Sequence, residues 1–302
     1  MGWEMSSDTN VSRSWRASSR SQLKLIASHI IETVSPNLFW RLKVRGLRRH
    51  LSEDELRIAP LLCDTNKISV DIGASLGIYA VNICNYSANC IAFEPRPAEA
   101  ARIREMAAAA GLRIEVEAVA LSDNAGLARL RILTKDPGRS TIENANALED
   151  PEGSPQTSIR IPRMRLDDYE LREVGFIKID VEGHELAVLQ GAQKTIRTSM
   201  PNLLVEIEER HRPGSIGEVS AFLADLGYEG FFVLDGELLP LARFDGSVHQ
   251  DPANVGSWKG GWARHGVYVN NFLFLPACRC GSLTTALVHL EWPTVKAYRA
   301  HQ

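Results

Sequence analysis

Cysteine, long apolar runs and net charge are all scarce in this chain, and each scarcity excludes a class of protein. The five cysteines among 302 residues are odd in number and scattered, which argues against a disulfide framework and favours a reducing compartment. The C-x-C pair Cys278 and Cys280 has no partner cluster, so we expect no metal site. No apolar run is long enough for a signal peptide or a membrane span, so we expect a cytoplasmic protein without a membrane span. A formal net charge of −3 gives no overall field for nucleic acid, and we expect no such partner.

The apolar content, in contrast, is sufficient for a complete core. At 44% hydrophobic residues, the chain suits one large domain with appendages or two small domains. Residues 1–19 lack apolar periodicity and are predicted to be a disordered tail. An apolar stripe from Leu23 to Val34 predicts an amphipathic helix, and a helical pattern at 52–62 completes an N-terminal helical extension over 20–63. Basic residues dominate the first fifty positions, which indicates a solvated arm or, alternatively, a patch for an anionic partner.

Residues 64–276 alternate short apolar strands with helical patterns, which predicts an α/β domain with parallel strands joined by right-handed crossovers. The expected strands are 68–72, 89–93, 114–119, 175–181 and 202–207, and the expected helices are 78–85, 97–110, 184–198 and 215–226. Antiparallel strands after five parallel ones match a class I methyltransferase (Rossmann-like) doubly wound sheet, mostly parallel with an antiparallel last strand.

The predicted antiparallel strands interrupt and then end this alternation. Strands at 127–133 and 158–163, followed by a short helix at 166–171, flank a loop at 136–156 that we expect to be a mobile lid. A hairpin at 228–241 and a strand at 267–275 end the domain, with a loop at 242–265 between them. Residues 277–302 have a weak pattern and are predicted to be a C-terminal tail.

One glycine turn organises the domain. Residues 68–79 (ISVDIGASLGIY) combine an apolar strand, a glycine turn and a helix start, where the backbone can approach a nucleotide-like ligand closely. The second and third glycines of the dinucleotide fingerprint are replaced by Ser75 and Ile78. Asp71 before the turn would repel a pyrophosphate but attract the cationic groups of S-adenosylmethionine. Glu94, at the end of the next strand, can accept both ribose hydroxyls.

Charged side chains gather near the ends of the fourth and fifth predicted strands: Lys178, Asp180, Glu182, His184, Glu206, Glu208 and His211. Period two places the first three on one side of their strand, where charges are costly unless paired. One interpretation is structural, with Lys178 paired to Asp180 or Glu206 and with Glu182 capping the next helix. The other is a substrate-facing acid/base cluster or a divalent-metal site, of which we favour a metal-free base. His211 is either an exposed loop histidine or a substrate contact.

Six motifs together resemble the FkbM-type S-adenosylmethionine-dependent methyltransferases. They are VDIGASLGIY (70–79), FEP (93–95), ALSD (120–123), RLDDY (165–169), IKIDVEGHE (177–185) and LQGA (189–192). The resemblance covers residues 66–212 and implies an O-methyltransferase acting on a hydroxyl of a small molecule, a sugar or a secondary metabolite. Ser75 is a departure, because the family usually has Asn at that position.

The resemblance also assigns residues. It implies a methionine cradle at Asp71, Gly73 and Gly77, a ribose contact at Glu94 and an adenine contact at Ser122 and Asp123. With their neighbours, the candidate cofactor residues are Asp71, Gly73, Ala74, Ser75, Gly77, Tyr79, Glu94, Pro95, Ser122 and Asp123. The candidate catalytic residues are Lys178, Asp180, Glu182, His184, Glu206 and His211, with Asp180 expected to carry the chemical step.

Two alternatives remain open. Lys178, Asp180 and Glu206 resemble a Lys-Asp-Lys-Glu tetrad of nucleotide 2′-O-methyltransferases, although the second Lys is missing and the chain is nearly neutral. A cofactor-binding regulatory module without catalysis is the other alternative, against which the intact Asp180 and Glu182 argue.

Overall fold

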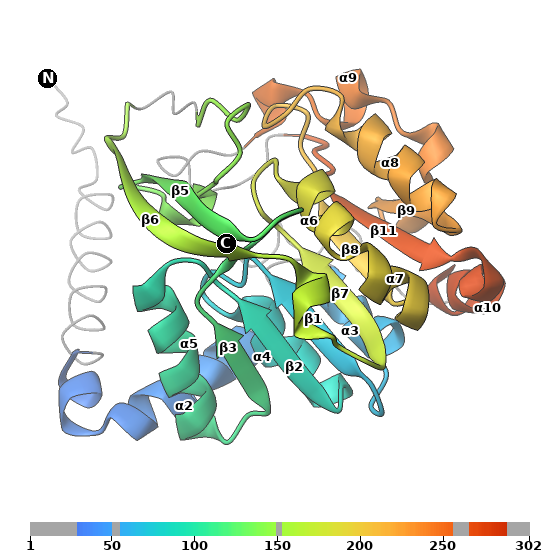
Figure 1. Ribbon diagram of the computed structural model, residues 1–302. Helices are drawn as coiled ribbons and strands as arrows, with labels where there is room; N and C mark the ends of the chain where they lie inside the picture. Colours follow the sequence, from blue (N-terminus) through green and yellow to red (C-terminus); the bar gives the residue numbers. More distant parts are fainter. Residues whose placement is uncertain (1–28, 50–54, 149–152, 256–265, 289–302) are drawn as a thin grey trace, which may run out of the picture.

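The computed structural model describes residues 29–49, 55–148, 153–255 and 266–288 (Figure 1). The predicted tail at 1–19 and most of the predicted helix from Leu23 to Val34 lie outside these ranges, and residues 29–34 are helical as expected. The N-terminal extension continues with α2 (Pro36–Arg49) and α3 (Glu55–Leu62). No helix in the described part of the chain is long and apolar enough to cross a membrane.

Within the described residues, eight strands form one large sheet in the order β10-β9-β11-β8-β7-β1-β2-β3. Its parallel strands are β1 (Ile68–Ile72), β2 (Asn89–Phe93), β3 (Ile114–Glu117), β7 (Val174–Ile179) and β8 (Asn202–Glu206). The antiparallel strands are β9 (Tyr228–Leu234), β10 (Glu237–Pro240) and β11 (Asn271–Pro276). Because β11 pairs antiparallel with both β8 and β9, the expected antiparallel insertion is confirmed.

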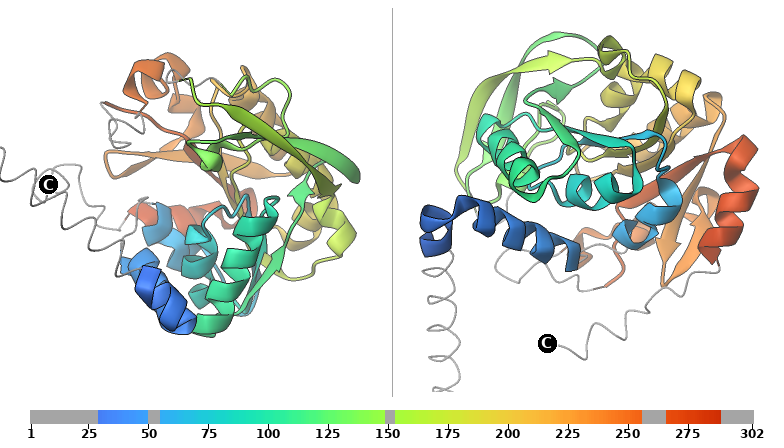
Figure 2. Two further views of the ribbon diagram at one scale, coloured as in Figure 1. Left: turned by 90° about the vertical axis from the view of Figure 1, so that its left-hand side faces the viewer. Right: turned by 90° about the horizontal axis from the view of Figure 1, so that it is seen from below.

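Helices cover both faces of this sheet, as a doubly wound fold requires. One face carries α6 (Glu185–Gly191), α7 (Gln193–Ser199) and α8 (Ser215–Asp225), and the other carries α2, α3, α4 (Ile78–Ile83), α5 (Pro97–Ala110) and α10 (Ala277–Val288). Each face of the sheet has its own apolar core beneath these helices. Strand β7 contributes to both cores, because side chains alternate along a strand: Ile177 and Ile179 pack on the α6–α8 face and Phe176 packs on the other. Figure 2 shows these layers from the side.

A smaller sheet follows β3 and consists of β4 (Ala120–Leu121), β6 (Gln156–Met164) and β5 (Gly126–Leu133), in that order. The antiparallel pairing of β5 with β6 confirms the strand pair expected from the sequence. The segment between them contains the short 3₁₀ helix η2 (Pro137–Arg139), and η3 (Leu166–Tyr169) returns the chain to β7.

The structure differs from the sequence prediction at several boundaries. The strand expected to reach residue 181 ends at Ile179, because Glu182 and Gly183 take left-handed φ angles of 56° and 100°. The single helix expected at 184–198 is two helices that meet at Ala192. The segment predicted as a loop from 242 contains α9 (Gly246–His249) and η5 (Pro252–Asn254), while 256–265 lie outside the described residues. Helix α10 occupies 277–288, where the sequence predicts only a tail, since Cys280 and Leu287 pack into the core.

Candidate active site

The glycine turn after β1 lies directly against the segment that follows β7. Gly73, Ser75 and Gly77 have positive φ angles of 82°, 50° and 77°. A Cβ atom added to Gly73 would lie 1.8 Å from the carbonyl oxygen of Asp180, so only glycine fits there. The Asp180 amide also donates to the Ile72 carbonyl over 2.9 Å. The predicted cofactor turn and the predicted catalytic aspartate are therefore neighbours.

Glu94, which ends β2, is held by four donors. Its Oε2 accepts from the Ser75 amide at 2.7 Å and from Arg96 Nη2 at 3.3 Å. Its Oε1 accepts from the amide and the Nε of Arg96, at 2.9 and 2.8 Å. Arg96 also donates to the Pro137 carbonyl and the Ser75 hydroxyl, at 2.7 and 3.1 Å. Since a carboxylate offers about four lone-pair sites, a ribose hydroxyl would replace the longest of these bonds, that from Nη2.

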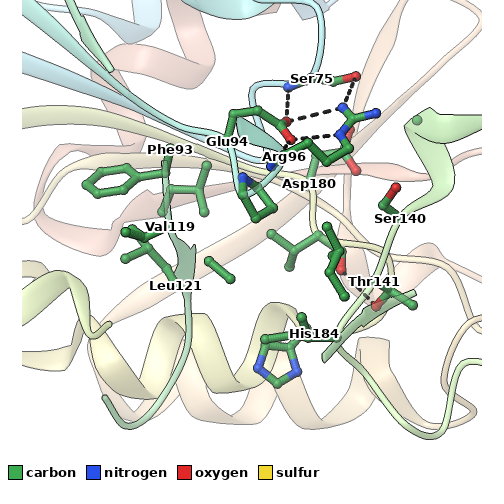
Figure 3. A pocket seen from close by; sticks show the side chains of 18 residues that line it. Ser75, Phe93, Glu94, Arg96, Val119, Leu121, Ser140, Thr141, Asp180 and His184 are labelled. Carbon is green, nitrogen blue, oxygen red and sulfur yellow. Dashed lines mark hydrogen bonds and ion pairs between the residues drawn. The ribbon is translucent and has the colours of Figure 1, made fainter. Parts of the chain in front are cut away.

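A cavity of about 510 Å³, open mouth included, lies beside this carboxylate. Figure 3 shows apolar side chains of Phe93, Val119 and Leu121 on one side of it, with Ser140 and Thr141 on the other. Glu94 and Arg96 lie at one end and His184 at the opposite end. An apolar slot that ends in a carboxylate suits a flat heterocycle joined to a sugar.

The predicted cofactor residues divide between this cavity and the layer beneath it. Gly73, Ser75, Glu94 and Pro95 line the cavity. The lining does not include Asp71, Ala74, Gly77, Tyr79, Ser122 or Asp123. Asp71 is 2% exposed and accepts from the Ala80 amide at 2.8 Å, which fixes the start of α4. Asp71 therefore supports the glycine turn and the first turn of α4 without lining the cavity.

A second cavity adjoins the first, and most of the residues that line it have polar side chains. It measures about 980 Å³ with its open mouth, and Gly73, Ser75, Gly138 and Asp180 line both cavities. The side chains that line only the second one are Asp136, Arg139, Glu182, Glu206, Glu208, Arg210, Val255, Tyr268 and Asn270. The structure thus brings Asp180, Glu182 and Glu206 together, as the sequence predicts.

Lys178 takes a structural position. Its side chain is 1% exposed, donates to Asn271 Oδ1 at 2.7 Å and lies 3.7 Å from Glu206 Oε2. Its ammonium group also sits over the Tyr79 ring, 4.9 Å from the centroid. The pair with Glu206 is one of the structural partners left open by the sequence, and Lys178 lines neither cavity.

Glu182 and His211 form a buried pair at the edge of the second cavity. Glu182 Oε2 and His211 Nε2 are 3.1 Å apart. Burial and the nearby Asp180, Glu208 and Glu206 carboxylates raise the pKa of Glu182 well above its ordinary value, while burial lowers the pKa of His211 to about 4. Both shifts favour the neutral form of the group, and the two atoms face each other without a hydrogen bond between them. The N-cap residue of α6 is His184, without a side-chain cap hydrogen bond, so Glu182 does not cap this helix. Glu185, the first residue of α6, accepts from the Gly183 amide at 2.8 Å.

His184 joins the first cavity to the loop after β5. Its Nε2 lies 2.9 Å from the Ser122 hydroxyl, and its Nδ1 lies 3.0 Å from Glu143 Oε2. The same loop is tied down by Thr141 and Asn146, which donate to the Glu182 carbonyl at 2.9 and 2.8 Å. The described part of the predicted lid is thus held over the junction of the cavities.

Several site residues do not stand out in the sequence: Arg96, Glu143, Arg210, Tyr268 and Asn270. Glu208 continues the period-two series begun by Glu206 and accepts from Arg210 Nε at 2.5 Å and from the Tyr268 hydroxyl. Burial alone would raise the pKa of Glu208, but these bonds hold it below its ordinary value. Tyr268 and Asn270 have no local signal, because only the insertion of β11 beside β8 brings them to the site.

The sheet order, the antiparallel β11 and a ligand-sized cavity at the carboxyl ends of β1 and β2 define the class I methyltransferases. The model of the methyltransferase FkbM domain family matches residues 71–229, and the chain belongs to this family.

Individual relatives are more distant. A hexuronic acid methyltransferase of Haloferax volcanii, AglP, is 27% identical over 168 residues, which are 56% of this chain and 65% of that protein, so the chain spans just under two thirds of its relative. The crystal structure of the methyltransferase FkbM from Methylobacillus flagellatus is 16% identical, with a TM-score of 0.43 over 70% of this chain and 44% of that one. A Streptococcus mutans protein in complex with SAH is 10% identical, with a TM-score of 0.38 over 73% and 94% of the two chains.

Proposed function

We propose that this chain is an S-adenosylmethionine-dependent O-methyltransferase that acts on a hydroxyl of a small, polyhydroxylated acceptor such as a sugar or a secondary metabolite. The observation that carries the proposal is Asp180, which lines both cavities at their junction. A methyl donor in the first cavity and an acceptor in the second would meet at this carboxylate. It is there that the acceptor hydroxyl has to be oriented and its proton taken.

The first cavity fits the cofactor. The apolar walls at Phe93, Val119 and Leu121 would enclose the adenine, Glu94 would hold the ribose, and the turn at Gly73 would face the methionine portion. S-adenosylmethionine supplies a methyl group that is activated by a positively charged sulfonium. The chain would exclude water with the loop held by Thr141 and Asn146.

Asp180 would orient the acceptor hydroxyl and take its proton, without a metal. Burial and the Asp180 carboxylate raise the pKa of the neighbouring Glu182, whose Oε2 lies 3.1 Å from His211 Nε2. His184 is fixed between Ser122 and Glu143, which suits it to shaping the cavity between donor and loop.

The second cavity favours a neutral acceptor. Five carboxyl side chains but only two guanidinium groups line it, and Arg210 is already engaged by Glu208. Carboxylates accept hydrogen bonds from sugar hydroxyls, whereas they repel another carboxylate. The AglP relative is named for a hexuronic acid; this lining supports a hexose or a similar polyol without the acid group.

Methyl-labelled donor tests this proposal. Purified protein is incubated with labelled S-adenosylmethionine and, separately, neutral hexoses, hexuronates, ribonucleotides or a small-molecule extract. We expect label in neutral hydroxyl compounds that resists mild base, as an ether does. Label in ribonucleotides alone would favour the 2′-O-methyltransferase alternative, against which the buried Lys178 argues. Transfer to hexuronates in preference to hexoses would contradict the neutral acceptor, and transfer to nitrogen would contradict the O-methyltransferase.

The setting we propose is cytoplasmic. All five cysteines lie in the described part of the chain and are free thiols, which suits a reducing compartment.

A further inference from the structure

The N-terminal helices expose bulky aliphatic side chains in an unusual concentration. Among the described residues, four of the large hydrophobic side chains that are most exposed lie within thirteen positions: Ile30 (55%), Val34 (78%), Leu38 (48%) and Leu42 (48%). Each follows the previous one by four residues, so on each helical segment they share a side. Isolated exposed leucines are ordinary, but a contiguous group marks an interaction surface.

These side chains do not belong to the packed side of α2. The helix contacts α5 and α4 through Val44, Trp40 and Leu47, which join the core on that face of the sheet. Leu38 and Leu42 lie on the opposite side by helical spacing, and Figures 1 and 2 show α2 at the outer boundary of the molecule. The helix therefore has two apolar sides, and only one of them is covered by the described residues.

Arginines extend the uncovered side. Arg45 follows Leu42 by three positions and Arg49 by seven, so the stripe continues from leucine to arginine on one side of α2. Arg45 and Arg49 are exposed, as is Arg41 on the adjacent row, which donates to the Ala109 carbonyl at 2.8 Å. We call Ile30, Val34, Leu38, Leu42, Arg45 and Arg49 the outer stripe.

We propose that the outer stripe docks this protein on an anionic lipid bilayer, with the aliphatic side chains at the acyl boundary and the arginines at the headgroups. Helices that lie on membranes combine these two features. A second copy of the chain would present the same stripe, which has no carboxylate to pair with the arginines. The segment 1–28 is an equally poor cover, because Arg13, Arg16, Arg20 and Lys24 repeat the positive charge. Nucleic acid would match the charge but gains little from valine and leucine, which neither stack nor hydrogen-bond with bases.

Vesicle flotation of the full-length protein tests the proposal. We expect the protein to float with phosphatidylcholine vesicles that contain phosphatidylglycerol, to float little with phosphatidylcholine alone, and to be released by high salt. Replacing Arg45 and Arg49 by Gln should lower partitioning about fivefold for each residue. The Leu38→Ser, Leu42→Ser double variant should lower it about tenfold or more.

Matched controls replace exposed residues elsewhere. Leu127→Ser on β5, where the side chain is 69% exposed, and Arg172→Gln before β7 should float like the wild type. Thermal unfolding of each variant checks that the fold is intact. Equal flotation with neutral and anionic vesicles, no flotation, or leucine variants that behave like the wild type would each overturn the proposal. A dimer in light scattering that disappears in the leucine variant would assign the stripe to a second copy instead.

Discussion

Asp180 is the residue whose proposed catalytic role can be tested separately from folding. Asp180→Asn keeps shape and volume but removes charge and basicity, so we expect turnover to fall by about 10²–10⁴ with little change in cofactor affinity or melting temperature. Activity, calorimetric titration and thermal unfolding are measured on the same protein, with Lys178→Met as the structural comparison. Loss of a buried charge partner costs about 3–5 kcal/mol of stability, so that second variant should melt earlier.

Three results would contradict this role of Asp180. Near-wild-type turnover of Asp180→Asn would remove it from the chemistry. A large drop in melting temperature would make it a structural residue. If chelation abolished wild-type turnover and Mg²⁺ restored it, the metal-free mechanism would be wrong.

Glu94 is the residue that we propose to hold the ribose of the cofactor. We expect calorimetric titration to show binding of S-adenosylmethionine but not of NAD, because the turn lacks the dinucleotide glycines. Glu94→Ala should weaken binding by about 1.5–3 kcal/mol, the range for hydrogen bonds to a charged group. Glu105→Ala, at an exposed position of α5, is the matched control. A loss below a few tenths of a kcal/mol would mean that the ribose is held elsewhere.

Glu185 gives the stability of this protein a pH dependence. Burial raises its pKa from 4.5 to about 7, although its carboxylate accepts a hydrogen bond from the Gly183 amide. The folded state therefore binds more protons than the unfolded state between these values, and stability falls as pH rises from about 4.5 to 7. Glu185→Gln keeps an acceptor for Gly183 without a charge to bury.

Comparing the wild type with Glu185→Gln isolates the contribution of the Glu185 carboxyl group to the pH dependence of stability. At pH 8 the variant should be more stable than the wild type by an amount on the order of 3 kcal/mol, and the difference should shrink toward pH 4.5. His211, whose pKa is lowered to about 4, has the opposite sign, since its contribution is lost as pH falls below 6.5. The His211 contribution is the same in the wild type and in Glu185→Gln, so it cancels in the difference between their stabilities. Parallel melting-temperature curves over this pH range would refute the assignment.

At the scale of elements, the loop between β5 and β6 is the segment that we expect a bound ligand to order. Its described part, 136–148, is tied to the site by Thr141, Glu143 and Asn146, and Arg96 reaches the Pro137 carbonyl. We expect hydrogen exchange of 136–148 to slow when the demethylated cofactor binds. The reason is that Arg96 contacts both Glu94, the proposed ribose contact, and the loop, so a bound ribose should fix the loop more firmly. The hairpin β9–β10 serves as the internal reference. Equal, strong protection with and without ligand would rule out a lid.

For the whole molecule, the sequence by itself determined the elements and their class. The strands at 68–72 and 89–93 and the helix at 97–110 are predicted to the residue, because apolar runs, glycine turns and the Pro97 start are local signals. The family and the turn that faces the first cavity followed from the same local patterns. The sequence correctly predicted that charged residues at the ends of β7 and β8 meet, since Asp180, Glu182 and Glu206 line one cavity. The predicted two-residue alternation did not position them, because β7 ends at Ile179 and Lys178 lines neither cavity.

Only the tertiary structure decided how these charges are used. It buried Lys178 beneath the site against Asn271 of β11, a residue 93 positions away. It also paired Glu182 with His211 and engaged Glu94 with Arg96, so that each acid has a different environment. The pairings of Lys178 and Glu182 join separate segments, so they depend on which strands become neighbours. Glu94 and Arg96 are near in the sequence, and there the tertiary structure decides how deeply both groups are buried. Burial sets protonation, and no local pattern in the sequence records it.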